Sequence, residues 1–194
     1  MNKLKLFPLG LVAYPTKIVP LHIFEERYKA LINECISLKQ EFGMVYSLDS
    51  GLADFGCSLT VSEVIKTYPS GEMDIITKGQ RIFKIHSNIV ENELNVGQVE
   101  FQDDKNESFG DQFDKLKEKY LKLLLQLGVT DQIERHMNKA RSFELIEHIQ
   151  LPHEVELLLI STRSEIDRLR VLDEIFDQIL KKGIDKINNQ VFKS

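Results

Sequence analysis

Residues 56–87 read GCSLTVSEVIKTYPSGEMDIITKGQRIFKIHS, and they carry most of the information about the fold. Two runs rich in β-branched residues flank residues 69–72 (PSGE), whose proline and glycine are typical of a tight turn. We therefore predict a hairpin over residues 58–78. Residues 79–80 (GQ) predict a second tight connection, and residues 81–87 then alternate between apolar and polar side chains, as a half-buried strand does.

The rest of the first hundred residues has the same character, with one interruption. The strand candidates are Lys3–Phe7, Ile18–Phe24, Phe42–Tyr46, Cys57–Tyr68, Met73–Lys78, Arg81–Ser87 and Leu94–Phe101. Residues 25–38 instead place apolar side chains at i, i+3, i+4, i+7 and i+8, which predicts an amphipathic helix. Many short strands with one inserted helix predict a small barrel or a sandwich.

The chain changes character near residue 102. Residues 102–110 (QDDKNESFG) are polar and end in glycine, so we predict a linker there. Beyond it, apolar residues recur at helical spacing, most clearly after Ser164, which can cap the last helix. The expected organisation is therefore α+β, with a β domain at 1–101 and an α-helical bundle at 111–194.

Charge and composition narrow the classes of function. The 194 residues carry a net charge of −5, which lowers the expectation of nucleic-acid binding. No run of apolar residues approaches the ~20 needed to span a bilayer, and the N-terminus is a poor signal peptide. We therefore expect a cytoplasmic protein with no membrane role. Cys35 and Cys57 are expected to be core residues rather than a disulfide framework.

The motifs that carry catalysis are incomplete. Gly51 and Gly56 have the separation of a phosphate-binding loop, but Cys57 stands where such a loop needs lysine. His153 opens a zinc-protease-like pattern whose second histidine is replaced by Leu157. No Gly-x-Ser-x-Gly elbow occurs. We predict no catalytic residue, no metal site and no cofactor, although residues that converge only in space could still form a hidden hydrolase site.

Two longer segments resemble a known family. Residues 6–32 (LFPLGLVAYPTKIVPLHIFEERYKALI) are similar to the opening signature of the Lon N-terminal domain family. Residues 56–87 resemble the hairpin of that family, which leads into a Gly-x-x-Arg-Phe pattern, and residues 42–45 (FGMV) resemble its short strand. The likeness is more diffuse after residue 101, where residues 143–176 resemble the helical extension.

The resemblance implies both a fold and a function. The implied fold is a PUA-like β pseudo-barrel with one inserted helix, followed by an α-helical bundle. In full-length Lon proteases this region recognises polypeptide substrates, and an ATPase and a Ser–Lys peptidase domain follow it. Because the sequence ends at Ser194, we expect a stand-alone, non-catalytic recognition module that acts in protein quality control or as an adaptor.

The implied partners are unfolded or exposed hydrophobic polypeptide segments and a separate protease or ATPase, with the chain itself a monomer or a weak homo-oligomer. Five residues are candidates for peptide contact: Tyr14, His22, Phe24, Tyr68 and Arg81. His22 and Phe24 alternate with Leu21 and Ile23, so one pair should face outward. Packing or cross-strand pairing stays open as an alternative for all five. RNA binding by a PUA-like barrel is the competing function.

Overall fold

The computed structural model describes residues 1–126, 128–129 and 133–182. The chain divides into two compact units, Met1–Asp103 and Asp104–Ser194, and each is described by itself. Residues 183–194 of the expected helical bundle lie outside the described residues.

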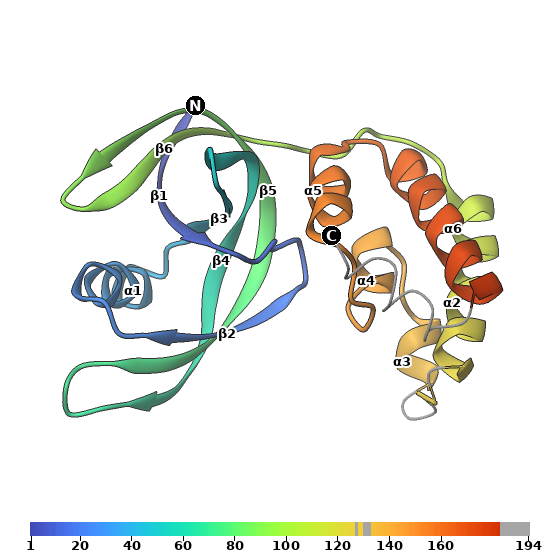
Figure 1. Ribbon diagram of the computed structural model, residues 1–194, viewed down its shortest axis with the longest axis horizontal. Coiled ribbons are helices and arrows are strands. Elements are labelled where there is room, and N and C mark those ends of the chain that lie inside the picture. Colours follow the sequence, from blue (N-terminus) through green and yellow to red (C-terminus); the bar gives the residue numbers. More distant parts are fainter. Residues whose placement is uncertain (127, 130–132, 183–194) are drawn as a thin grey trace. The chain divides into compact units, whose positions relative to one another are not determined.

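The first unit is a closed β-barrel (Figure 1). Its elements are β1 (Asn2–Leu9), β2 (Ile18–Ile23), α1 (Glu26–Leu38), β3 (Phe42–Leu48), β4 (Gly51–Thr67), β5 (Met73–Glu91) and β6 (Leu94–Phe101). The strand order is β2-β5-β4-β3-β1-β6, and an additional β5–β6 pairing joins the two ends of the run β5-β4-β3-β1-β6 into a ring. The prediction of a barrel with one inserted helix is thereby confirmed.

The β4–β5 hairpin is longer than the sequence indicated. The turn after Tyr68 is present, with the Gly71 N–H donating to the Tyr68 carbonyl. The predicted connection at residues 79–80 is wrong, because β5 runs unbroken from Met73 to Glu91. The glycine at position 79 has another role: a Cβ there would lie 2.0 Å from the Tyr14 carbonyl oxygen. Gly79 therefore allows the loop before β2 to lie directly on β5.

Helix α1 closes one outer face of the barrel. Its side chains Tyr28, Leu31, Ile32 and Cys35 are buried in a core shared with Phe7 of β1. The Phe7 and Tyr28 ring centroids lie 4.1 Å apart. Fully burying a large apolar side chain of this kind contributes roughly 1.5–3 kcal/mol, so this interface is enough to hold α1 on the sheet.

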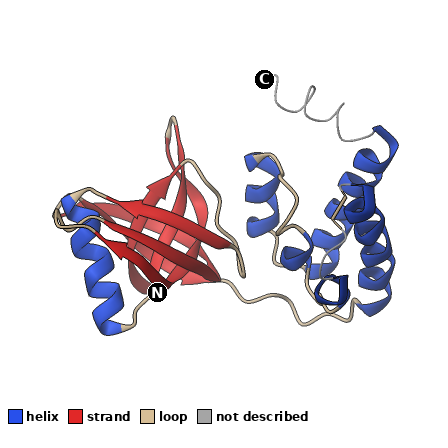
Figure 2. Cartoon of the chain, turned by 90° about the horizontal axis from the view of Figure 1, so that it is seen from below, coloured by secondary structure: helices blue, strands red, loops and turns tan. Residues whose placement is uncertain are grey.

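The second unit is helical (Figure 2). It contains α2 (Gly110–Gln126), α3 (Ile133–Met137), α4 (Ser142–Leu145), α5 (His153–Ser161) and α6 (Glu165–Lys182). Helices α2 and α6 pack together: the rings of Tyr120 and Phe176 stack at 6.3 Å, and the Lys119 Nζ lies within 2.8 Å of carboxylates on Asp173 and Asp177. The hydroxyl of Ser164 accepts the backbone N–H of Asp167, so Ser164 caps α6 as expected.

The segment between the units is partly anchored. Residues 102–109 form neither helix nor strand. However, the carboxylate of Asp104 forms a bidentate ion pair with the buried guanidinium of Arg168. The carboxylate of Glu107 accepts the hydroxyl proton of Ser164. The Lys105 N–H also donates to the Arg163 carbonyl. From Asp104 onward the segment is therefore bonded to the start of α6.

Candidate functional site

Strand β2 presents alternate side chains to solvent. Val19 and Ile23 are buried, whereas His22 and Phe24 are exposed, and the Phe24 side chain keeps 60% of its surface in contact with solvent. The predicted alternation is confirmed, and the outward pair is His22 and Phe24. An exposed phenylalanine beside a structured strand is available for contact with a partner.

Two of the candidate residues join His22 in one cluster. The His22 ring is near-parallel to that of Phe24 at 6.0 Å, and it meets the edge of Tyr68 at 6.0 Å and 81°. Tyr68 comes from the end of the β4–β5 hairpin, more than forty residues along the chain. We call His22, Phe24 and Tyr68 the aromatic cluster.

A carboxylate missing from the sequence prediction holds the cluster in place. Asp74 is paired with His22 across the β2–β5 ladder. One of its oxygens lies 2.6 Å from His22 Nδ1, and the other accepts the Tyr68 hydroxyl proton at 2.7 Å. These bonds from His22 and Tyr68 lower the pKa of Asp74 below its usual range. One feature of the sequence could have pointed to Asp74, because aspartate is rare within strands and this one lies within a predicted strand.

Charged groups of both signs surround the aromatic cluster. The Lys66 ammonium lies 4.2 Å from the centroid of the Tyr68 ring. The Glu72 carboxylate lies 3.8 Å from His22 Nε2. Lys66 is also the cross-strand partner of Asp74, so His22, Asp74 and Lys66 form one row across three strands. The cluster is therefore an aromatic surface with a mixed charged border rather than a basic patch.

The other two candidates lie elsewhere. Tyr14 is only 3% exposed and belongs to the core, so its ring is not offered to a partner at the surface. The guanidinium of Arg81 pairs with Glu41 at 2.9 Å and stacks 3.7 Å above the Phe101 ring. The structure thus brings together three of the five candidates and places Tyr14 and Arg81 outside the cluster.

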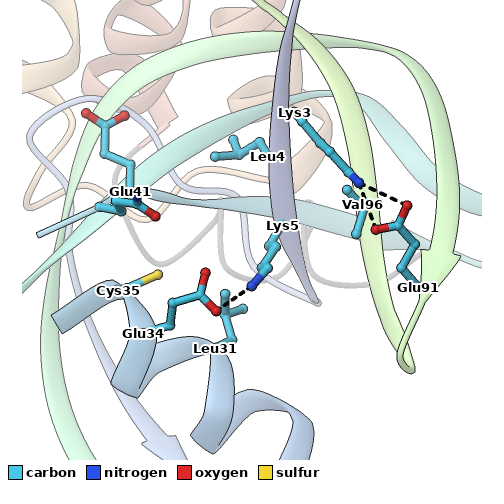
Figure 3. A pocket seen from close by; sticks show the side chains of 10 residues that line it. Lys3, Leu4, Lys5, Leu31, Glu34, Cys35, Glu41, Glu91 and Val96 are labelled. Carbon is cyan, nitrogen blue, oxygen red and sulfur yellow. Dashed lines mark hydrogen bonds and ion pairs between the residues drawn. The ribbon is translucent and has the colours of Figure 1, made fainter. Parts of the chain in front are cut away.

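A separate cavity lies between α1 and the outer face of β1 and β6 (Figure 3). Its volume is about 270 Å³. The lining residues are Lys3, Leu4, Lys5, Leu31, Glu34, Cys35, Gln40, Glu41, Glu91 and Val96. Two ion pairs cross between elements here, Lys3–Glu91 at 2.8 Å and Lys5–Glu34 at 2.5 Å. We call this cavity the α1–β1 pocket.

The cysteines are not suited to nucleophilic chemistry. Burial raises the pKa of the Cys35 thiol to about 11 and that of the Cys57 thiol to about 12. Both thiols therefore stay protonated near neutral pH, and the thiolate is the reactive form. In the described residues, no group of three or more His, Cys, Asp or Glu side chains is arranged to hold a metal ion.

None of the helices in the described part of the chain combines the length and hydropathy that a membrane span requires.

A closed PUA-like barrel joined to a helical unit is the architecture of a Lon N-terminal domain, and the similarity of this chain to known proteins supports the same assignment. Residues 3–175 match the family model of the ATP-dependent protease La (LON) substrate-binding domain. Because this match covers most of the sequence, the chain belongs to that family.

Two solved structures share the fold. The first is a Lon N-terminal domain protein from Xanthomonas campestris, with 23% sequence identity and a TM-score of 0.70 over 94% of this chain and 99% of that one. The second is the N-terminal domain of Mycobacterium avium complex Lon protease, with 14% identity and a TM-score of 0.75 over 91% of this chain and 98% of that one. At these identities the likeness extends to the fold alone.

Proposed function

We propose that this chain is a non-catalytic module that recognises polypeptides, and that the aromatic cluster contacts the bound segment. Membership of the substrate-binding family of Lon supports recognition of polypeptide. The finer role that we propose is selection of unfolded or exposed hydrophobic segments on behalf of a separate protease or ATPase, in protein quality control.

The observation that carries the proposal is the exposed ring of Phe24, which lies beside rings that hydrogen bonds hold in place. Removing its ring from water on binding would be favourable, at roughly 25 cal/mol for each Å² of apolar surface buried. Aromatic residues of this kind are enriched among the residues that dominate binding energy at interfaces. The bonds of Asp74 to His22 and Tyr68 hold the neighbouring rings, so little side-chain entropy is lost when a partner binds.

Side-chain contact is favoured over addition of a strand to the sheet. In the described part of the chain, β2 pairs with β5 alone, so its other edge is the place where a strand could add. The Val19 carbonyl accepts the Thr77 hydroxyl proton and so faces β5. Along a strand, the N–H and C=O groups of successive residues point to opposite edges, so the backbone groups of Pro20 point to the open edge. Proline has no N–H to donate there. The edge is therefore a poor template for an added strand.

The RNA-binding alternative gains no support at this surface. Nucleic-acid binding relies on lysine and arginine placed to neutralise phosphates. Around the aromatic cluster, Lys66 is accompanied by the carboxylates of Glu72 and Asp74. These acidic groups oppose a phosphate backbone.

Binding of labelled peptides tests the proposal. The probes are unstructured peptides of about 15 residues, which extend to about 50 Å at ~3.3 Å per residue. One set carries apolar residues in a Gly/Ser/Gln background, and the other set has the background alone. We expect fluorescence anisotropy to show binding of the apolar peptides and Phe24→Ala to weaken it about tenfold, the effect of losing a central aromatic contact. Leu48→Ala, at another exposed apolar residue, is the matched control and should bind like the wild type. Failure of the wild-type protein to bind any of the peptides would refute the proposal.

A further inference from the structure

We propose that the α1–β1 pocket is a second recognition subsite, which accepts one uncharged apolar side chain of a bound polypeptide. This inference rests on the proposed function and adds to it a location and a side-chain class.

The floor of the pocket is apolar. Leu31, Cys35 and Val96 are buried and line it from α1 and β6. The raised pKa of the Cys35 thiol keeps that group neutral, so the floor presents no charge. Such a floor favours an aliphatic or aromatic group over a polar one, because a polar group placed there would lose its bonds to water.

The charges at the rim are satisfied within the protein. Lys3 pairs with Glu91 and Lys5 with Glu34 (Figure 3), and Glu41 pairs with Arg81. Each lysine thus has a carboxylate within 2.8 Å. A charged ligand would have to break one of these pairs to gain another, whereas an uncharged side chain leaves all of them intact. The rim therefore favours a neutral occupant.

Exposed apolar residues extend the pocket along the surface. Ile89 is opposite Val96 in the β5–β6 ladder, and Val96 is opposite Lys5 in the β1–β6 ladder. Opposite residues of paired strands project from the same face, so all three lie on the face that α1 covers. Ile89 is 53% exposed there, and Leu38, one helical turn beyond Cys35, is 58% exposed. The face that α1 covers and the end of α1 thus carry further exposed apolar surface that a longer chain can cover.

The size of the pocket favours a side chain over a free small molecule. Its 270 Å³ lies below the ~300–1,000 Å³ typical of pockets that enclose drug-sized ligands. The pocket also lies within reach of the aromatic cluster along α1. Lys29 near the start of α1 donates to the carbonyl of Ser70, in the turn that follows Tyr68, while Glu34 and Cys35 line the pocket. The helix rises about 9 Å from Lys29 to Cys35 at 1.5 Å per residue, and its full length is about 20 Å. About six extended residues span even the full length, so they are enough to connect the two sites.

Peptides with a single anchor test the pocket. The probes are Gly/Ser/Gln peptides of about 15 residues that carry Phe for the aromatic cluster and, about six positions away, either Leu, Lys or Glu. We expect the wild-type protein to bind the Leu peptide about tenfold more tightly than the Lys or Glu peptide. The variant Val96→Thr, which places a hydroxyl group in the apolar floor of the pocket, should weaken that preference. Threonine is β-branched like valine and suits a strand equally well, so the variant should fold, which circular dichroism checks.

The matched control is Val90→Thr, the same replacement at an exposed residue of β5 that is adjacent to Ile89 and so points to the other face of the strand. It should keep the preference for Leu. In ¹H–¹⁵N spectra, the Leu peptide should shift the amides of Leu31, Lys5 and Val96. An unchanged preference in Val96→Thr, or no shift at these amides while the peptide binds, overturns the pocket assignment and leaves the proposed function intact. Absence of any peptide binding to the wild-type protein would instead refute the proposed function.

Discussion

Replacing Arg168 by methionine should destabilise the helical unit more than any surface change. The Arg168 side chain is 1% exposed, and its guanidinium donates to the carboxylates of Asp104 and Glu165, to the Ser142 hydroxyl and to the Thr162 carbonyl. The variant removes all these bonds at once. It also leaves the buried carboxylate of Glu165 without its counter-charge.

The expected loss of stability depends on how deeply each hydrogen-bond partner of Arg168 is buried. The Asp104 carboxylate is partly exposed and can be rehydrated, so its lost pair costs about 1 kcal/mol or less. The Glu165 carboxylate is 1% exposed and, among the residues that the structure describes, keeps two bonds, both from Ser142, so most of the cost arises there. Breaking a buried pair in this way costs about 3–5 kcal/mol, against a total stability of about 5–15 kcal/mol for a typical domain.

Urea denaturation followed by circular dichroism at 222 nm is the assay, because most of the helices belong to the second unit and the chain has no tryptophan. Arg168→Met should lower the midpoint of the helical transition by roughly 1–5 M, given a slope of about 1–3 kcal/mol per M. Arg170→Met removes an exposed pair with Asp167 and should change stability by less than about 0.5 kcal/mol.

Combining Arg168→Met with Glu165→Gln removes the buried charge and should recover part of the loss. The reasoning is refuted if Arg168→Met costs less than about 1 kcal/mol, or if the combined variant is less stable than Arg168→Met alone.

Two further perturbations concern other parts of the chain. Gly79→Ala should destabilise the barrel by about 1–3 kcal/mol, since its Cβ would collide with the Tyr14 carbonyl. Thermal melting measures this loss, with Gly10→Ala as the control, because a Cβ at position 10 would have no atom within 4 Å. Burial, His148 and Lys139 lower the pKa of His136 below its ordinary value. In the unfolded chain the histidine has its ordinary pKa of about 6.5 and takes up a proton first as the pH falls. The folded state therefore has its full stability above about pH 6.5 and loses part of it below that pH. The urea midpoint of the helical unit should therefore drop between pH 7.5 and pH 5, and less so in His136→Gln; an equal drop in both proteins would contradict this.

The sequence predicted the local features of the β unit and missed those that depend on distant partners. Alternation along β2 placed His22 and Phe24 on one face because side-chain direction in a strand has a period of two. Tyr14 was a candidate for peptide contact, but the loop that carries it lies on β5, where Gly79 makes room for it. The bond between His22 and Asp74 joins residues 52 positions apart. No local pattern encodes such a pairing, since it depends on the register of the β2–β5 ladder.

Closure of the barrel explains how the unit can display apolar side chains without inviting strand-by-strand aggregation. Aggregation through β-structure needs an open edge with unpaired N–H and C=O groups, and an apolar strand is dangerous mainly there. Ring closure by β5 and β6 pairs the strands on which Ile89 and Val96 lie. At β2, whose outer edge stays open in the described part of the chain, Pro20 interrupts the row of donors. Phe24 and Ile89 are therefore available to a partner through their side chains, while the backbone beneath them is a poor template for further strands.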